Sequence, residues 1–355
     1  MSELITQLSD DAITLLKALI QTPSFSREEA GTAALIEQFL SHHHIPAQRR
    51  GNNVWAISKN YDPRNPTILL NSHHDTVRPG AGWTVEPFGA AVVGDKLFGL
   101  GSNDAGAAAV SLLATFCYFY DQKTTFNLIC AITAEEEISG AGGIVSILPE
   151  LGKIDVGIVG EPTGMRVAVA EKGLMVLDVV ARGRTGHAAR DEGDNALYRA
   201  LDAIAWLRTY QFPQVSPLLG PVKMTVTQIT AGTQHNVVPD ECRFVVDIRT
   251  NEFYSNEEIL ATVRAHVPAD ITPRSTHLQS SGISLTHSLV QKVVALGKTT
   301  YGSPTLSDQA LLRSDTLKMW PGESARSHTP DEYILLSEIR GGIQDYIALL
   351  TDFAL

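Results

Sequence analysis

The sequence predicts an α/β protein whose main domain has a mixed, mostly parallel sheet and is interrupted by a smaller inserted domain. Toward both ends of the chain, apolar segments of strand length alternate with segments of helical periodicity, the pattern of a layered α/β domain. Between residues 174 and 283 the pattern changes to β-α-β-β-α-β, a ferredoxin-like order. With 355 residues, 44% of them hydrophobic, the chain can bury two cores.

The outer segments, 1–173 and 284–355, are expected to form one discontinuous domain. Apolar residues three and four apart predict its helices, and short apolar runs bounded by turn residues predict its strands. The expected helices are 10–20, 28–42, 106–119, 289–299 and 337–353. The expected strands are 54–57, 67–70, 127–133, 156–159 and 317–320.

The inserted segment, 174–283, reads by the same criteria as an independent domain of ordinary size. Its expected strands are 175–180, 222–229, 243–248 and 271–275, and its expected helices are 195–208 and 257–266.

Composition excludes several classes of partner. The formal charge is −11 and the pI is near 5.4, which is unfavourable for gripping phosphate backbones, so no nucleic-acid partner is expected. The start has no basic segment followed by an apolar core, and no apolar run is long enough for a membrane span. Three scattered cysteines form no CxxC pair, which favours a reducing cytoplasm.

Three adjacent carboxylates, Glu135, Glu136 and Glu137, follow the apolar run 127–133. Adjacent like charges repel each other and contribute nothing to folding, whereas a multivalent cation would turn that repulsion into attraction. A solvated acidic loop is the alternative, since charge runs are usually exposed.

Other apolar runs also end in residues that can bind metals. His73 and Asp75 follow the strand 67–70 and, being two apart, share a face of an extended chain, although His-x-Asp is also common in surface turns. Glu161 follows the strand 156–159. Asp104 precedes a helix that it could cap, and His328 lies in a polar loop where exposure is the alternative. Because ligands collect beyond the carboxyl ends of strands in open α/β sheets, the set predicts a metal centre.

At this point the sequence resembles the M20 family of zinc aminoacylases and peptidases along its whole length. The family's motifs appear in the family's order. They are His73-His74-Asp75-Thr76-Val77, Gly101 to Asp104, Thr133-Ala134-Glu135-Glu136-Glu137, Gly160-Glu161-Pro162, and His328 followed by the acidic cluster to Glu332.

The resemblance implies a di-zinc, peptidase-like catalytic domain with two Zn²⁺ per subunit. Asp104 would bridge the ions, His73 and Glu161 would hold one, and Glu137 and His328 the other. Co²⁺ or Mn²⁺ could satisfy the same nitrogen and oxygen ligands.

The resemblance also assigns roles beyond the metals. Glu136 would be the general base, and Asp75 would orient the imidazole of His73. In the inserted domain, expected to be a lid through which the chain forms a homodimer, His187 would polarise the scissile carbonyl. Asn236 would contact the substrate, and Arg249 would grip its α-carboxylate.

Two positions depart from the family pattern. Many members have Asp-x-Lys-Gly where this chain has Asp104-Ala105-Gly106, one residue shorter and without the lysine. Arg190 stands where a proline often follows the lid's Gly-His motif. The resemblance therefore leaves the local loop after Asp104 and the placement of His187 open.

The expected activity is removal of the acyl group from an N-acyl amino acid. The segment Leu97 to Asp104 most resembles the corresponding segment of acetylornithine deacetylase and of N-acyl-ornithine or citrulline deacylases. This resemblance would place the chain in arginine biosynthesis. A di- or tripeptidase acting on short peptides, and a ligand-binding homologue without activity, are the alternatives. No Gly-x-Ser-x-Gly elbow supports a serine hydrolase.

Overall fold

The computed structural model describes residues 2–355. Cα packing divides the chain into a first unit, Met1–Val169 with Gly282–Tyr301 and Ser307–Leu355, and a second unit, Ala170–Ser281 with Gly302–Leu306. Within the described residues, every helix is too short or too polar to cross a membrane.

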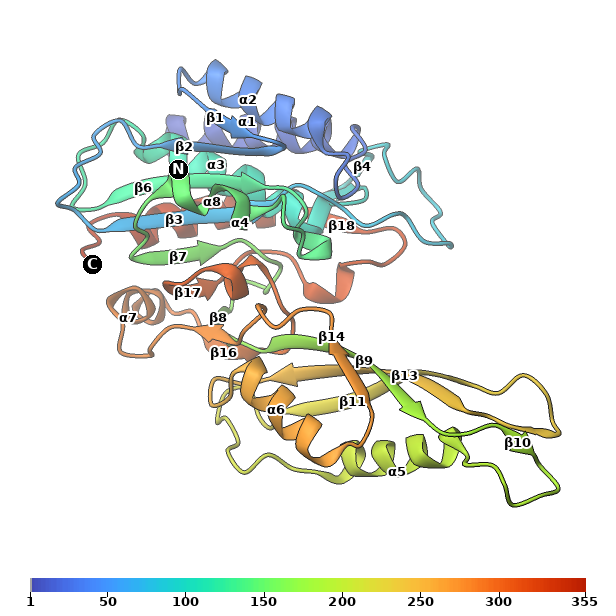
Figure 1. Cartoon of the computed structure of the whole chain (residues 1–355). Coiled ribbons are helices and arrows are strands. Elements are labelled where there is room, and N and C mark those ends of the chain that lie inside the picture. The colour runs from blue at the N-terminus through green and yellow to red at the C-terminus, as the bar shows by residue number, and fades with distance from the viewer. Residues whose placement is uncertain (1) are drawn as a thin grey trace. The chain divides into compact units, whose positions relative to one another are not determined.

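The first unit contains most of the helices and the largest sheet (Figure 1). Its helices and helical turns are α1 (Glu3–Ile20), α2 (Ala30–His42), η1 (Ser102–Gly106), α3 (Ala107–Phe119), η2 (Glu136–Ile138), α4 (Ile144–Leu151), α7 (Ser288–Ala295), η3 (Asp308–Leu311), η4 (Ser324–Arg326) and α8 (Leu336–Leu350). Its strands are β1 (Gln48–Arg50), β2 (Asn53–Ile57), β3 (Thr67–His73), β4 (Val92–Val93), β5 (Lys96–Phe98), β6 (Asn127–Thr133), β7 (Val156–Val159), β17 (Asp315–Lys318) and β18 (Tyr333–Leu335). Strands β8 (Val167–Glu171), β15 (Ser281–Gly282) and β16 (Thr300–Ser303) cross the boundary between the units.

The main sheet has parallel strands at its centre and antiparallel strands beside them. Its order begins β1-β2-β6-β3-β7-β17-β8. Strand β3 pairs in parallel with β6 and β7, and β7 pairs in parallel with β17. The pairs β1–β2, β2–β6 and β17–β8 are antiparallel. The predicted α/β class with a mixed, mostly parallel sheet is confirmed.

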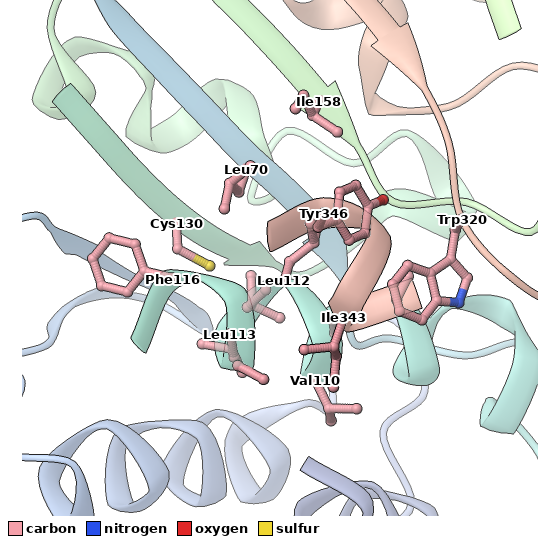
Figure 2. Packing of buried hydrophobic residues seen from close by; sticks show 14 of the residues in the cluster. Leu70, Val110, Leu112, Leu113, Phe116, Cys130, Ile158, Trp320, Ile343 and Tyr346 are labelled. Atoms are coloured by element: carbon pink, nitrogen blue, oxygen red, sulfur yellow. The ribbon is translucent and has the colours of Figure 1, made fainter. Parts of the chain in front are cut away.

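Both faces of the sheet are covered, which explains why its strands read as continuous apolar runs. In β3, Ile68 and Leu70 point into the larger core, built with α1, α3 and α8. The intervening Leu69 points to the opposite face, where it packs in a smaller core with Ile147 of α4. Figure 2 shows Leu70 of β3 near residues of α3 and α8 in the larger core.

Several helix boundaries differ from the sequence prediction for local reasons. Helix α1 begins seven residues early, at Glu3, because the Ser2 side chain accepts a hydrogen bond from the Ile5 N–H and caps the helix. Helix α7 ends at Ala295 instead of residue 299, since Gly297 has a φ of +80° and leaves the helical region. Helix α4 was not predicted, and neither was β8.

The second unit is a four-stranded antiparallel sheet in the order β11-β13-β9-β14 with two helices. Its elements are β9 (Gly173–Arg182), β10 (Gly186–His187), α5 (Ala196–Thr209), β11 (Lys223–Ala231), β12 (Val237–Val238), β13 (Glu241–Thr250), α6 (Asn256–His266) and β14 (Asp270–Pro273). Alternate residues of β9 and β13 pack with α5 and α6 in one core, while the residues between them stay half-exposed. This is the predicted ferredoxin-like order.

Candidate metal centre

The carboxyl ends of three parallel strands bring the first site residues together. His73 is the last residue of β3 and lies opposite Thr133, the last residue of β6. Glu161 follows β7 after Gly160, where an added Cβ would lie 2.9 Å from the Cβ of Ala108. Glycine is therefore needed for α3 to pack this closely behind the strand end.

The turn after β6 separates the three adjacent glutamates. Glu135 has a φ of +56°, and its carboxylate turns away to accept the N–H of Gly142 at 3.3 Å. The side chains of Glu136 and Glu137 are 13% and 8% exposed, and both lie within ion-pair distance of a histidine. Two of the three carboxylates thus belong to the site, and the solvated-loop alternative does not hold for them.

Asp104 lies in an irregular loop before α3. Gly101 has a φ of +75°, and Asp104 has non-helical angles of φ −119° and ψ 100°. The N-cap position of α3 is Gly106, and no side chain caps the helix. The helix-cap alternative for Asp104 is therefore excluded, and its carboxylate is available to the site.

His73 faces three carboxylates through one ring nitrogen. Its Nε2 lies 3.4 Å from Asp104 Oδ1, 3.5 Å from Glu161 Oε1 and 3.7 Å from Glu136 Oε2. Its Nδ1 lies 3.1 Å from the carbonyl oxygen of Asp75 and 3.3 Å from that residue's carboxylate. A proton on Nδ1 satisfies both acceptors, so the lone pair of neutral His73 is on Nε2 and points into the cluster.

His328 approaches the same cluster from the C-terminal part of the chain. Its Nε2 lies 3.1 Å from Glu137 Oε2 and 3.5 Å from Asp104 Oδ2. The carboxylate of Asp104 therefore lies between two imidazoles, with Oδ1 toward His73 and Oδ2 toward His328. The structure brings all five predicted metal ligands into one cluster.

Asp75 supports the cluster from behind. Its buried carboxylate accepts the hydroxyl of Ser26 at 2.7 Å and the N–H groups of Glu136 and Glu137 at 3.0 and 3.2 Å. The same side chain lies beside His73 Nδ1, so it links the orientation of the imidazole to the turn that carries the two glutamates.

The proton affinities of the cluster are strongly perturbed. Burial would lower the pKa of His73, but the carboxylates of Glu136, Asp104, Asp75 and Glu161 outweigh it and raise that pKa well above the ordinary value. Burial raises the pKa of Glu136 well above its usual range and that of Glu161 to about 8, although His73 opposes both shifts. The hydrogen bond that His328 donates to the Glu137 carboxylate raises the pKa of His328 to about 9. These shifts indicate an excess of buried negative charge.

The residues fit a divalent metal. Within residues 2–355, His73 Nε2 is fully buried and has no hydrogen-bond partner, although carboxylates surround it. Two sets, His73 with Glu136 and Glu161, and His73 with Asp104 and Glu137, each place one ligand atom per residue within 4.8 Å of the others. Imidazole nitrogen and carboxylate oxygen are donors that zinc and related ions accept.

The other predicted site residues belong to the second unit. His187 is the last residue of the short strand β10, and its Nδ1 accepts the N–H of Ala189 at 3.1 Å. The carbonyl oxygen of Asn236 accepts the N–H of Ala188 at 3.0 Å, and His187 pairs with Val237, so Asn236 and His187 lie on neighbouring segments. Arg249 is the second-to-last residue of β13, and its guanidinium forms a bidentate pair with the Asp247 carboxylate, at 2.9 and 3.1 Å.

Sequence reasoning missed three polar residues around the cluster. Ser26 donates to Asp75, and buried Asp308 accepts the Thr133 hydroxyl at 2.8 Å. Glu332 accepts backbone N–H groups of the Asp104 loop. Of the three, only Glu332 could have been singled out from the sequence, because it ends the acidic cluster that follows His328. The positions of Ser26 and Asp308 beside the site depend on tertiary contacts that a single sequence does not reveal.

Comparison with known proteins agrees with this geometry. Residues 169–272 match the model of the peptidase dimerisation domain of the M20 family. A succinyl-diaminopimelate desuccinylase of Dinoroseobacter shibae is 31% identical over 274 residues, covering 72% of each chain. The enzyme of that name from Rhodospirillum centenum is 26% identical over 298 residues, covering 78% of this chain and 77% of the relative.

Among solved structures, a dinuclear metal-binding peptidase of the M20 family from Bacillus subtilis has the same fold. It is 17% identical, with a TM-score of 0.71 over 97% of this chain and 98% of the other. The similarity to the Dinoroseobacter enzyme, together with the matched dimerisation domain, establishes that this chain belongs to the M20 family of metal-dependent hydrolases.

Proposed function

We propose that this protein hydrolyses the amide bond of an N-acyl amino acid at a centre of two divalent cations. The observation that carries the proposal is the position of the Asp104 carboxylate, which turns one oxygen toward His73 and the other toward His328. A carboxylate between two imidazoles, with further acidic groups on each side, is the donor arrangement that a bridged pair of metal ions requires.

His73 and Glu161 would hold one cation, and Glu137 and His328 the other. The donor set favours Zn²⁺, and Co²⁺ or Mn²⁺ accept the same ligands. Such cations supply Lewis-acid polarisation of an amide carbonyl and lower the pKa of water toward neutrality. Asp75 would keep the proton of His73 on Nδ1 and so keep Nε2 free for the metal.

Glu136 is the group best placed to move the proton. Its Oε2 lies 3.7 Å from His73 Nε2, inside the cluster, and burial raises its pKa well above the usual carboxyl range. A carboxylate of raised basicity takes a proton from water more readily and returns it to the nitrogen of the departing amine. Its backbone N–H is fixed by Asp75, which holds the base in place.

The second unit offers groups suited to an anionic substrate. We infer that His187 polarises the scissile carbonyl, that Asn236 contacts the substrate, and that Arg249 binds its α-carboxylate. Lys223 lies directly opposite Arg249 in the β11–β13 ladder, so the two side chains share a face. Burial lowers the pKa of Lys172, and the nearby charges of Lys223 and Arg249 lower it further. Three cations, Lys172, Lys223 and Arg249, gather here against the one carboxylate of Asp247 that pairs with Arg249, and this excess of positive charge suits a ligand with more than one carboxylate.

This charge distribution, together with the names of the relatives, favours an N-succinyl amino acid. Succinyl-diaminopimelate desuccinylases release a dicarboxylic acyl group, as their name states. The sequence prediction of Nα-acetylornithine and arginine biosynthesis has no corresponding support, although acetyl and succinyl substrates differ only in the acyl chain. The amino-acid portion is best identified by assay.

We also propose that the protein is a homodimer through its second unit. Strand β11 lies at one edge of that unit's sheet, and Ile229 on it is 49% exposed. Tyr198 and Leu201 of α5 are 65% and 51% exposed. An open edge strand with exposed apolar side chains is a surface that a second copy can cover. The mass in light scattering should fall to that of a monomer in Ile229→Lys and stay dimeric in Leu296→Lys, which alters an exposed apolar residue of the first unit.

A substrate panel tests the activity. We expect release of amine from N-succinyl amino acids to exceed that from N-acetyl analogues and from di- and tripeptides, to stop with chelator, and to return when Zn²⁺ or Co²⁺ is added back. Glu136→Gln should bind metal normally and lose activity by about 10²–10⁴-fold, the usual worth of a general base. Wild-type turnover by this variant would refute the role of Glu136, and a preference for dipeptides would identify a peptidase instead.

A further inference from the structure

A buried carboxylate, Glu332, borders the metal cluster without belonging to its ligand set. The residue is 2% exposed and lies four positions after His328, directly before β18. Its carbonyl oxygen accepts the N–H of Gly99 at 3.0 Å, which fixes its backbone beside the end of β5. The cluster already carries excess negative charge, so a further buried carboxylate costs free energy that hydrogen bonds must offset.

The side chain of Glu332 is surrounded by backbone donors of the Asp104 loop. Its Oε1 accepts the N–H groups of Asn103 and Asp104 at 2.8 and 2.9 Å, and its Oε2 accepts the N–H of Gly101 at 3.2 Å. Gly101 has a left-handed conformation, and the N–H groups of Gly101, Asn103 and Asp104 converge on one point, which creates an anion-binding concavity. The anion bound in this concavity is the carboxylate of Glu332, a side chain of the same protein.

Helix α3, which begins at Ala107, does not satisfy these donors. Asp104 and Ala105 have non-helical angles, so the N–H groups before them do not enter the hydrogen-bond ladder of α3. The side chain of Asn103 adds a second connection, donating to the carbonyl of Glu323 at 3.1 Å and to the hydroxyl of Ser327 at 3.2 Å. The Asp104 loop is thus tied to residues 323–332, the segment that also supplies His328.

One segment therefore approaches Asp104 from two sides. His328 contacts the Oδ2 atom of its carboxylate, and Glu332 holds its backbone N–H. Rotation of the Asp104 backbone would move both carboxylate oxygens at once, away from His73 and from His328. A carboxylate suits the concavity better than an amide, because all three partners donate and only a carboxylate can accept at both of its oxygens.

We propose that Glu332 is a positioning residue for the metal centre: it fixes the backbone of Asp104 so that one carboxylate oxygen faces each metal position. This inference rests on the proposed function only in taking Asp104 as a ligand of both cations. It assigns Glu332 no contact with substrate or metal, so its effect reaches the reaction through Asp104 alone.

The test is a titration of the metal-free protein with Co²⁺, followed by visible absorption and by calorimetry. Glu332→Gln should bind the two ions 10–100-fold more weakly, the usual effect of removing a group that orients a ligand, and its absorption bands should change in position or intensity. In the turnover assay, kcat should fall while KM changes little. The matched control is Asp331→Asn, which alters the neighbouring carboxylate that accepts the N–H groups of Thr84 and Val85. We expect wild-type Co²⁺ affinity and spectrum from it.

Two results would overturn the proposal. One is wild-type Co²⁺ affinity and spectrum in Glu332→Gln, and the other is an equal loss in Asp331→Asn, which would assign the effect to the loop as a whole. If Glu332→Gln does not fold, Glu332→Asp is the second variant: it withdraws the carboxylate from the three N–H donors by one methylene group, so unchanged Co²⁺ binding in it would also overturn the proposal. The titration uses no substrate, so failure of the N-acyl amino acid assay refutes the proposed function without affecting this result.

Discussion

Asp75 fixes two parts of the metal centre with one carboxylate. It lies beside the Nδ1 of His73, and it accepts the N–H groups of Glu136 and Glu137. These bonds set which nitrogen of the imidazole carries the proton and where the turn after β6 is held. The orientation of the imidazole and the position of the proposed base are therefore coupled through a single side chain.

The substitution Asp75→Asn should weaken divalent-metal binding by about 10–100-fold and lower kcat, because the amide NH₂ faces N–H donors where the carboxylate oxygen accepted from them. Competition with a chromophoric chelator measures the affinity. The matched control is Ser26→Ala, which removes only the hydroxyl donor of Asp75 and should cost about 1 kcal/mol of stability with a small change in metal binding. Wild-type metal affinity in Asp75→Asn would show that the carboxylate has no orienting role.

Residue types could be predicted from the sequence better than the directions of their side chains. The run Glu135-Glu136-Glu137 indicates a metal site, but its letters do not say that Glu135 turns away; that depends on a left-handed residue inside the turn. Likewise, Asp104 satisfies both the ligand and the helix-cap pattern, and only the irregular backbone before α3 decides between them.

At the level of secondary structure, strand ends, one irregular loop and the segment after η4 that carries His328 build the centre. Strands β3, β6 and β7 are rigid because both faces of the sheet are packed, so their carboxyl ends provide fixed positions. The loop from Gly101 to Gly106 supplies the remaining carboxylate, and its path depends on a left-handed residue at its start.

The substitution Gly101→Ala should destabilise the protein by about 1–3 kcal/mol and weaken metal binding, because an alanine there has an unfavourable φ of +75° and its Cβ would lie 2.6 Å from Thr76 Cγ2. Urea denaturation measures the free energy of unfolding. Gly94→Ala is the control, since Gly94 has a similar φ of +62° and open space around it. Equal losses in both variants would mean that the close approach to Thr76 is unimportant.

Buried strands and amphipathic helices were predictable, whereas several short or sheet-edge elements were not. The runs 127–133 and 156–159 match β6 and β7 because strands covered on both faces must be apolar throughout. Helix α4 has only eight residues and contains Pro149, so its sequence resembles a loop. Strand β17 ends at Lys318, two residues before the predicted end, and Trp320 packs in the core as part of the following segment.

For the whole molecule, the charge of the cluster makes stability depend on pH and on metal. In the metal-free protein the pKa of Glu161 is raised from 4.5 to about 8 and that of His328 from 6.5 to about 9. At a pH between the unfolded and folded pKa values of either group, the folded state binds more protons than the unfolded state. The free energy of unfolding therefore falls as pH rises from about 5 to 9.

The melting temperature of the chelator-treated protein should therefore decrease between pH 6 and pH 9. Added Zn²⁺ should raise it more at pH 8 than at pH 6, since protons compete with the metal for the same atoms. Differential scanning calorimetry measures both effects, and Glu161→Gln should reduce the slope. A melting temperature that rises with pH in the presence of chelator would contradict the proposed charge balance.

The order of strands in the main sheet also determines which strand edge is exposed while the chain is being synthesised on the ribosome. Strand β17 lies between β7 and β8, yet it is encoded more than a hundred residues after both. A nascent chain that has emerged only as far as the second unit therefore presents β7 with an open edge, the kind of edge that pairs with other chains. The N-terminal half should need protection from self-association until residue 318 has left the exit tunnel, whereas the second unit has all four strands of its sheet by residue 273.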